Sequence, residues 1–389
     1  MKKYRTFIAL VAVQTIFTIG MIHYFRSQTQ PEVQASKKVP PWIPGVHKKT
    51  ASEVSEFRHS PDTVLIGYFH GGRTIIIYRT KIFDEFKKEN LDVEFVTKKL
   101  GEDHFTVMPN ILNLPPGNHK NLGKATGDEL VALVESGELD GATIGETAFI
   151  NAIRNGHDSI VAVAELGHDV KRGAGHALVL HKDIKVKGPN SLRGLKFGAR
   201  RSSGGDEVVL REFLVQNGLD PDRDVKIVSD VQDDVFGPMI ASRELDGGYG
   251  HVLAVEKWIR KYKYPIYIYR PLDWINPELS HSLLVFSRKY IEENRDKVQR
   301  IVRAYMRRTR HETTIPHEEK TEPKVKGLQI ALDFEGLNLP EHRLIPKVQV
   351  KLLNEWQELL IKHKHLDRKV DLTANIDSSF VESAARELD

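Results

Sequence analysis

From Thr63 onward, short apolar runs alternate with segments in which apolar residues recur at helical spacing. Strands that alternate with helices are typical of an α/β architecture with largely parallel sheets. The apolar runs predict strands at Val64–Phe69, Val93–Val96, Ala142–Ile144, Ile160–Ala164, Ala177–Leu180, Leu195–Ala199, Val225–Val228, Gly248–Tyr249, Ile266–Tyr269 and Leu283–Phe286.

Helical spacing is clearest in Asp206–Asn217, where the apolar residues fall on one face. Gly218 follows directly, and glycine suits the left-handed conformation at a helix end. The basic segment Arg288–Arg310 is predicted to be one helix, whose arginines form a solvated face rather than a nucleic-acid or lipid surface. Further helices are predicted at Asp128–Glu135, Lys347–His363 and Ser378–Leu388, and another is expected to start near Thr74.

One tetrapeptide occurs twice, as Glu138–Gly141 and as Glu244–Gly247. Each copy follows a helical pattern and leads into a short predicted strand. Two similar lobes would explain this repetition, whereas a surface turn that recurs by chance is the alternative. The shared helix-turn-strand context favours two lobes.

The first 26 residues differ in character from the rest of the chain. Basic residues precede an apolar run from Thr6 to Phe25, and a run of about 20 residues is long enough to span a bilayer. We therefore expect residues 1–26 to be an uncleaved membrane anchor, with the body exported; cleavage after Ala35 is the competing interpretation. Residues 27–61, rich in proline, are predicted to be a flexible tether, and the folded body is expected to begin near Asp62.

Composition narrows the range of functions that the chain could have. The chain has 389 residues, of which 40% are hydrophobic and 28% charged, and a net charge of +4. This length suits two domains, and the small net charge gives no reason to expect a nucleic-acid partner. The chain contains no cysteine, which excludes disulfides, thiolate catalysis and thiolate metal sites.

Catalytic motifs are missing from the sequence. It has no Gly-x-Ser-x-Gly elbow, no P-loop and no His-Glu-x-x-His zinc pair. The segment Gly173–Gly175 lacks the third glycine of a dinucleotide-binding loop, and the 17 histidines are scattered. We therefore expect no enzyme activity, no metal site and no cofactor.

The clearest candidate for ligand chemistry is the loop between the strand at Leu195–Ala199 and the helix at Asp206–Asn217. The first N–H groups of a helix have no partner within it, and the helix dipole adds partial positive charge, so anions bind there. An ordinary capped loop, in which Asp206 accepts from these N–H groups, is the alternative. The predicted ligand residues of this loop are Arg201, Ser202, Ser203 and Gly204.

Two further loops follow predicted strands and lead into helices. Ligands of open α/β sheets bind outside the carboxyl ends of strands, so we predict that all three loops line one cleft. An ionised Glu146 would repel a bare anion, which favours a zwitterion or an organic anion with an amine or amide at its other end. The predicted ligand residues of these two loops are His70, Gly71 and Gly72 in the first, and Gly145, Glu146 and Thr147 in the second.

At these residues the sequence resembles the nitrate/sulfonate/taurine group of periplasmic solute-binding proteins, most closely the aliphatic-sulfonate type. Thr143–Ile150 stands where such proteins have a loop that lines the cleft. Gly175–Asp183 looks like the strand by which the chain leaves the first lobe. Ser191–Gly198, followed by Arg201–Gly204, is similar to the family's strand and serine-bearing ligand loop.

The resemblance implies a type II periplasmic binding protein fold, with two Rossmann-like lobes joined by crossing hinge strands. Lobe I would comprise residues 62–177 and 283–389, and lobe II residues 178–282. The lobes would close over a small anionic or zwitterionic solute and deliver it to the permease and ATPase of an ABC importer, without catalysis. Such a protein would reside in the periplasm or on the outer face of the inner membrane.

The sequence also departs from the family pattern. His251 and Leu253 stand where the family commonly has a Trp-x-Pro segment, so an aromatic wall would come from Trp274 or Phe69 or be missing. His251 is nevertheless expected to shape the cleft. Residues 101–127 look like an insertion. These departures leave a membrane-anchored sensor or a scaffold with a degenerate cleft as the alternative function. A catalytic thiamine-pyrimidine synthase branch uses a cysteine-rich segment, which this chain lacks.

Overall fold

The computed structural model describes the folded body but not every residue of it. The chain divides into two compact units, residues 1–48 and 49–389, and the described residues belong to the second. The predicted anchor, residues 1–26, lies outside them. Among the described helices, none combines the length and the apolar character needed to cross a bilayer. The described residues are 54–69, 72–98, 104–108, 125–170, 176–199, 205–231, 233–251, 255, 258–259, 261–271, 275–314 and 341–389.

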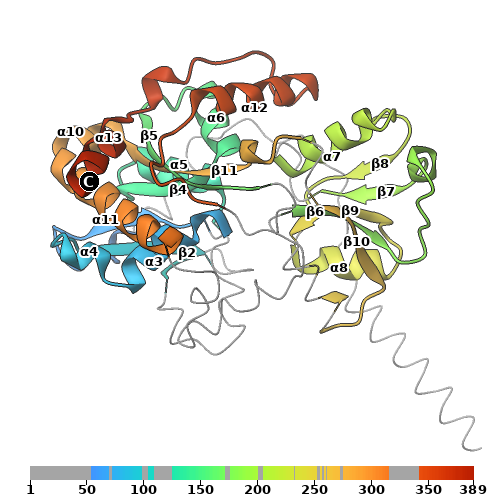
Figure 1. Cartoon of the computed structure of the whole chain (residues 1–389), viewed down its shortest axis with the longest axis horizontal. Coiled ribbons are helices and arrows are strands. Elements are labelled where there is room, and N and C mark those ends of the chain that lie inside the picture. The colour runs from blue at the N-terminus through green and yellow to red at the C-terminus, as the bar shows by residue number, and fades with distance from the viewer. Residues whose placement is uncertain are drawn as a thin grey trace, which may run out of the picture. The chain divides into compact units, whose positions relative to one another are not determined.

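The first sheet is mixed and has six strands in the order β3-β2-β1-β4-β11-β5. The central strand β1 pairs in parallel with β2 and with β4, whereas β11 runs antiparallel to both of its neighbours. Figure 1 shows this sheet with helices on both faces. Its strands are β1 (Val64–Gly67), β2 (Val93–Lys98), β3 (Phe105–Val107), β4 (Gly141–Gly145), β5 (Ile160–His168) and β11 (His281–Ser287).

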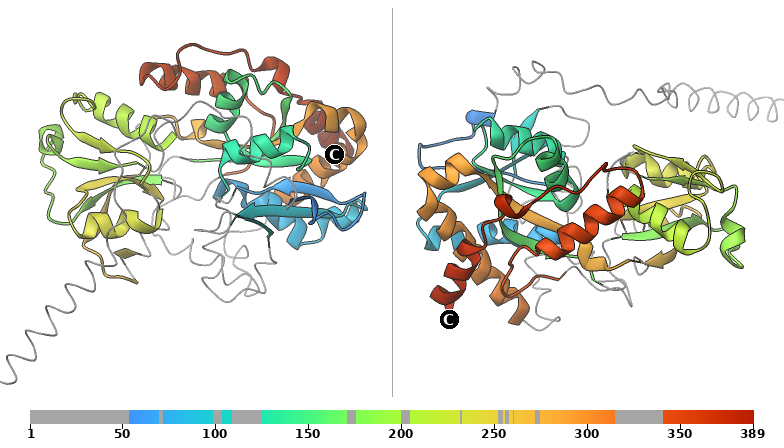
Figure 2. Two further views of the ribbon diagram at one scale, coloured as in Figure 1. Left: turned by 180° about the vertical axis from the view of Figure 1, so that it is seen from behind. Right: turned by 90° about the horizontal axis from the view of Figure 1, so that it is seen from above.

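Alternating side chains of this sheet enter two different cores, because successive residues of a strand point to opposite faces. Leu65 packs with the helices α5 (Gly127–Glu135) and α6 (Glu146–Arg154). Ile66 packs on the other face, with helices from both ends of the chain. Figure 2 shows the C-terminal helix, in red, beside the orange α11. The helices of this second face are α3 (Ile75–Ile82), α4 (Glu85–Lys88), α11 (Arg295–Thr314) and α13 (Ser379–Leu388), and α10 (Arg288–Glu293) precedes α11.

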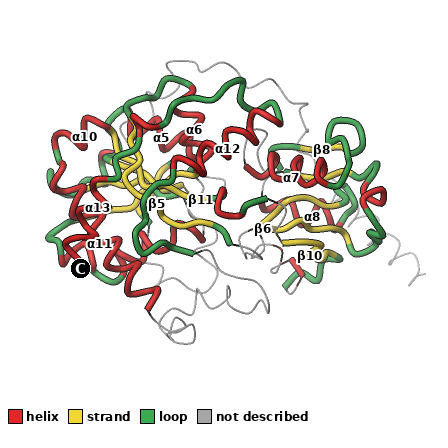
Figure 3. The backbone as a smooth tube through the Cα atoms, turned by 45° about the horizontal axis from the view of Figure 1, so that its top comes forward, coloured by secondary structure: helices red, strands yellow, loops and turns green. Residues whose placement is uncertain are grey.

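The second sheet has five strands in the order β10-β6-β9-β7-β8. The same alternation operates here: Leu178 packs with α7 (Gly205–Gln216), and Val179 packs with α8 (Asp233–Ala241) on the opposite face. Figure 3 shows these two helices with the strands β6 and β10. The strands are β6 (His176–His181), β7 (Lys196–Gly198), β8 (Lys226–Val228), β9 (Gly247–His251) and β10 (Ile266–Pro271).

These elements confirm the predicted α/β fold, but both sheets are mixed and not largely parallel as predicted, because β11 and β6 each run antiparallel to both of their neighbours. Each predicted strand overlaps an observed strand, and the predicted helices are present. The basic helix is interrupted at Asn294, which separates α10 from α11. The short strand β3 was not predicted, and it lies inside the segment 101–127 that looked like an insertion. The remaining elements are α12 (Val350–Lys362) and the 3-10 turns η2 (Gly72–Thr74), η5 (Pro189–Leu192), η6 (Pro277–Leu279) and η10 (Thr373–Asn375).

The chain passes between the sheets twice. Strand β5 of the first sheet is followed by β6 of the second, and β10 of the second by β11 of the first. The two connections meet at one point, where the N–H of Asp169 donates to the carbonyl of Ser280 at 2.9 Å. The predicted bounds of the lobes, 62–177 with 283–389 and 178–282, stay a prediction.

The repeated tetrapeptide has the same role in both sheets. The N–H of Asp140 donates to the carbonyl of Leu65 at 2.9 Å, and its carboxylate accepts from the N–H of Leu65 at 2.8 Å. Asp246 forms the same two hydrogen bonds with Lys196, both at 2.8 Å. Each aspartate therefore links the turn after a helix to the neighbouring parallel strand.

The folded part of the chain begins earlier than the sequence analysis expects. Val54 is fully buried in the first core, although it lies in the predicted tether 27–61. The guanidinium of Arg58 donates two hydrogen bonds to the carboxylate of Asp140, at 2.9 and 3.0 Å. These contacts place Val54 and Arg58 in the folded body, ahead of the predicted start near Asp62.

The arginines of α11 are also not the solvated face that their spacing predicts. Arg303 and Arg307 both pair with Glu89, and the side chain of Arg303 is 25% exposed. Burial raises the pKa of Glu89, but hydrogen bonds from the two arginines outweigh it and lower this pKa overall. Arg308 is buried and pairs with Glu312. Arg303 and Arg307 therefore attach this helix to the end of α4, on the same face of the first sheet.

Candidate functional site

The structure describes only part of the predicted site. Gly72 opens the turn η2, and Gly145, Glu146 and Thr147 form the junction of β4 and α6. His251 ends β9, where its backbone pairs with that of His176. The predicted ligand residues His70, Gly71, Arg201, Ser202, Ser203 and Gly204 lie outside the described residues, as does Trp274.

The position of Glu146 follows from the local backbone. Strand β4 ends at Gly145, which has an extended conformation and is the N-cap of α6. Glu146 is therefore the first residue of the helix, at the carboxyl end of a parallel strand. Its side chain is 7% exposed. The junction thus places a buried carboxylate at the edge of the sheet where α/β proteins bind ligands.

Arg73 lies opposite this carboxylate. It belongs to η2, which follows β1, and β1 pairs with β4 in parallel, so their carboxyl ends are adjacent. The Nη1 atom of Arg73 is 3.7 Å from Oε2 of Glu146. Both atoms are buried, and neither has a hydrogen-bond partner within the structure described. A solute that accepts from Arg73 and donates to Glu146 would satisfy both.

Electrostatics at this pair favour a protonated or hydrogen-bonded Glu146. Burial raises the pKa of Glu146 to about 7, because desolvation of the carboxylate outweighs the attraction of Arg73. Asp169 and Asp206 raise this pKa further. Burial alone would lower the pKa of Arg73, but the carboxylates of Asp169 and Glu146 reverse this effect and raise it. The described part of the site therefore surrounds one guanidinium with carboxyl groups.

Thr147 connects the site to the C-terminal part of the chain. Its hydroxyl accepts a hydrogen bond of 2.8 Å from the indole N–H of Trp356, a fully buried residue of α12. Helix α7 begins at Gly205, so Asp206 lies inside its first turn and not at the N-cap position considered from sequence. A Cβ atom on Gly205 would lie 2.9 Å from Cζ2 of Trp356 and 3.4 Å from Oε1 of Glu146.

Sequence reasoning missed the partners that complete this arrangement. Arg73 stands next to the predicted His70–Gly72 loop, but nothing in its local pattern distinguishes it from a surface arginine. Trp356 lies in a helix far along the chain, and the spacing of that helix predicts a buried face without saying what it covers. Phe69, considered from sequence for an aromatic wall, is half-buried just after β1, and its N–H donates to the Thr143 hydroxyl at 2.9 Å.

A second group of buried titratable side chains lies where the chain crosses between the sheets. His168 Nδ1 is 2.8 Å from the carboxylate of Glu165, which also accepts from Arg343 at 3.1 Å. His281 is 1% exposed, and its Nδ1–H donates to the carbonyl of Leu279 at 2.9 Å. Among the residues described, no three His, Asp or Glu side chains are grouped so as to hold a metal ion.

Comparison with solved structures identifies the fold. The ligand-binding component of an ABC-type import system from Staphylococcus aureus is 15% identical, over 84% of this chain and 99% of that chain, with a TM-score of 0.57. The periplasmic aliphatic sulphonate binding protein SsuA from Escherichia coli is 15% identical, over 82% and 93%, with a TM-score of 0.58. The desulfurization enzyme DSZB is 12% identical, over 84% and 100%, with a TM-score of 0.54. At these identities the similarity establishes the periplasmic binding protein fold.

Sequence comparison identifies the family. None of the curated proteins matches the chain significantly. A family model described as NMT1/THI5 like matches residues 124–318, which is half of the chain and includes strands of both sheets. The chain therefore belongs to the NMT1/THI5-like family, as a protein with the α/β fold of periplasmic solute-binding proteins.

Proposed function

We propose that this protein is the solute-binding component of an ABC importer, and that it captures a small zwitterionic or anionic organic solute of the sulfonate or taurine kind. Its family and fold agree with this role, and its structural neighbours include a component of an ABC-type import system and a sulfonate-binding protein. The observation that carries the choice of solute is the buried Arg73–Glu146 pair.

The two groups of this pair suit opposite ends of a zwitterion. Glu146 accepts a hydrogen bond from an amine, and Arg73 contributes positive charge for an anionic group. The loop Arg201–Gly204 supplies further donors for that anion, through its serine hydroxyls and its position before α7. A bare anion such as nitrate would gain nothing from Glu146, so an amine or amide on the solute is favoured.

Binding without catalysis is the role that we propose. The chain has no cysteine and none of the hydrolase, nucleotide or zinc motifs sought in its sequence. The neighbour DSZB demonstrates that this fold also supports an enzyme. An arginine beside a carboxylate is sufficient to orient a solute, and no bond needs to be broken for transport.

Residues 1–26 are proposed to hold the protein on the outer face of the inner membrane, where a permease and its ATPase would receive the solute. Full-length protein should then fractionate with membranes. The mass of the mature chain provides the test. A chain that begins at Ser36 would replace the anchor with a cleaved signal and would leave export unchanged.

The proposed solute can be tested by titration calorimetry with taurine and ethanesulfonate, which differ in the amine. Glu146→Gln should bind taurine at least about tenfold more weakly than wild type, because a hydrogen bond to a charged group is worth roughly 1.5–3 kcal/mol. Binding of ethanesulfonate should change little. Glu85→Gln is a matched control, since the side chains of Glu85 and Glu146 are 8% and 7% exposed and Glu85 lies before the amino end of β2.

Two further measurements separate this proposal from its alternatives. A mass spectrum of native protein, purified without refolding, weighs any retained solute; a neutral or cationic solute would contradict the role of the loop Arg201–Gly204. Small-angle scattering with saturating solute tests closure of the lobes. An unchanged radius of gyration would favour a rigid scaffold over an importer component.

A further inference from the structure

Helix α12 is attached at both ends to the first sheet. Before the helix, the carbonyl of Pro346 accepts from the N–H of Glu165 on β5 at 2.8 Å. After it, the N–H of Asp377 donates to the carbonyl of Ala162, also on β5, at 3.0 Å. The segment between these anchors therefore belongs to the first sheet, although it extends to the second.

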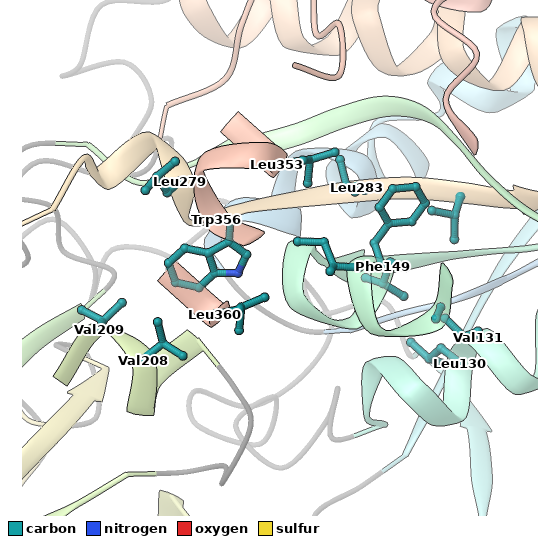
Figure 4. Packing of buried hydrophobic residues seen from close by; sticks show 14 of the residues in the cluster. Leu130, Val131, Phe149, Val208, Val209, Leu279, Leu283, Leu353, Trp356 and Leu360 are labelled. Carbon is teal, nitrogen blue, oxygen red and sulfur yellow. The ribbon is translucent and has the colours of Figure 1, made fainter. Parts of the chain in front are cut away.

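The middle of α12 lies between α6 and α7. Trp356 donates its indole N–H to Thr147 of α6, and its ring is so close to α7 that Gly205 leaves no space for a side chain. One hydrophobic cluster contains Trp356 together with Val208 and Val209 of α7. Figure 4 shows the indole between these valines and residues of the first sheet. Trp356 thus joins the starts of two helices that belong to different sheets.

The C-terminal end of α12 adds polar contacts to the same helix of the second sheet. The carboxylate of Glu212 on α7 is 2.7 Å from Nζ of Lys362 and 2.9 Å from Nε2 of His363. Glu212 and His363 are both buried, so solvent screens this interaction much less than an exposed ion pair. The contact lies two turns along α7 from Gly205, which gives the two helices a second fixed point.

We propose that α12 is a strap that holds the two sheets in their arrangement without solute, with Trp356 as a positioning residue for the ligand site. Trp356 contacts Thr147 and Gly205, the neighbours of Glu146 and of the predicted loop Arg201–Gly204. Its packing therefore sets the separation between the two sides of the site. The strap concerns the arrangement of the sheets, so it stands whichever solute the site accepts.

The absence of cysteine makes a distance measurement direct, because two introduced cysteines would be the only labelled positions. Arg223 follows α7 in the second sheet, and Lys289 lies on α10 beside the first; their side chains are 86% and 80% exposed. Spin labels at Arg223→Cys and Lys289→Cys would report the distance between the sheets by double electron–electron resonance, in full-length protein without added solute.

Glu212→Ala removes the acceptor that Lys362 and His363 share, and Trp356→Phe removes the indole N–H while keeping an aromatic ring. Glu85→Ala is the matched control. The side chain of Glu85 is 8% exposed against 7% for Glu212, and it too pairs with two cations, Lys88 and Arg307, but within the first sheet alone.

Both strap variants should give a broader or longer distance distribution than wild type, and Glu85→Ala should give the wild-type distribution even if its melting temperature falls. Wild-type distributions in Glu212→Ala and Trp356→Phe would overturn the proposal, as would an equal broadening in Glu85→Ala. Trp356→Phe decides the question alone if Glu212→Ala does not fold.

Discussion

The Nη1 atom of Arg73 lies 3.7 Å from Oε2 of Glu146, and neither atom has a hydrogen-bond partner in the described structure. Desolvation of such a pair costs free energy that attraction across this distance does not return in full. We therefore expect a solute that pairs with both groups to offset this cost. This relationship makes the stability of the protein depend on pH.

Glu146→Gln should change that dependence. The pKa of Glu146 is about 7 in the folded protein against its usual 4.5, so the folded state binds more protons than the unfolded state between these values. Its contribution to stability must then decrease as pH rises from 4.5 to 7. Relative to Glu146→Gln, wild type should lose up to about 3 kcal/mol of unfolding free energy across this range. Urea unfolding at pH 4.5, 6 and 8 measures the difference, and curves that stay parallel would contradict the prediction.

His281→Asn should reduce the loss of stability that the protein undergoes when the pH falls. Burial lowers the pKa of His281 to about 4 from its usual 6.5, against the attraction of Glu165. The unfolded chain then takes up a proton first, so this group reduces stability as pH falls from 6.5 to 4. Asparagine can keep the hydrogen bond to the Leu279 carbonyl but cannot be protonated. The variant should lose less stability than wild type between pH 7 and pH 4.5, whatever its stability at pH 8. An equally steep loss would show that other groups control acid unfolding.

Asp140→Ala should be more damaging than Asp246→Ala, although both residues hold the same turn. Each carboxylate accepts from a backbone N–H near the start of a neighbouring strand, and its loss should cost roughly 1.5–3 kcal/mol. Asp140 is the more buried, with 8% of its side chain exposed against 18%, and it also holds the guanidinium of Arg58. Denaturant unfolding of the two variants provides the comparison. Among the described residues Asp246 pairs only with the more exposed Arg243, at 3.1 Å, so equal losses would mean that the Arg58 contact contributes no more than this one.

The repeated tetrapeptide explains why so much of the fold could be predicted. The alternation of apolar residues in strands and their helical spacing between strands are local properties of the sequence. Each tetrapeptide forms the turn between a helix and the next strand. The same hydrogen bonds at Asp140 and Asp246 then result from the same local sequence. The position of Glu146 at the carboxyl end of β4 was predicted for the same reason, because a strand is followed directly by a helix there, and its part in binding stays a prediction.

The contacts that complete the site could not be predicted in this way, because they join distant segments. Arg73 can be recognised as a site residue only because it lies beside Glu146. The hydrogen-bond donor to Thr147 is Trp356, near the other end of the chain. Sequence spacing indicates that α12 has a buried face, but the helices α6 and α7 that it covers come from two different sheets. The arginines of α11 were misread for the same reason, since their carboxylate partner Glu89 is far away in sequence.

The start of the folded body offers the last test, because the sequence pattern and the structure disagree there. Scattered apolar residues in a polar, proline-rich segment show no clear periodicity, so Val54 was assigned to the tether, yet it is fully buried. A chain that begins at Ser60 loses this residue, the partly buried Phe57 that packs against the same core, and Arg58, whereas a chain that begins at Lys49 keeps all three. Burial of a valine side chain is worth about 1.5–3 kcal/mol, and the bidentate Arg58–Asp140 contact adds to it. The shorter chain should therefore be less stable by about 2–4 kcal/mol in urea unfolding. Arg58→Ala in the longer chain separates the ion pair from the apolar burial, and equal stability of the two chains would restore the boundary near Asp62.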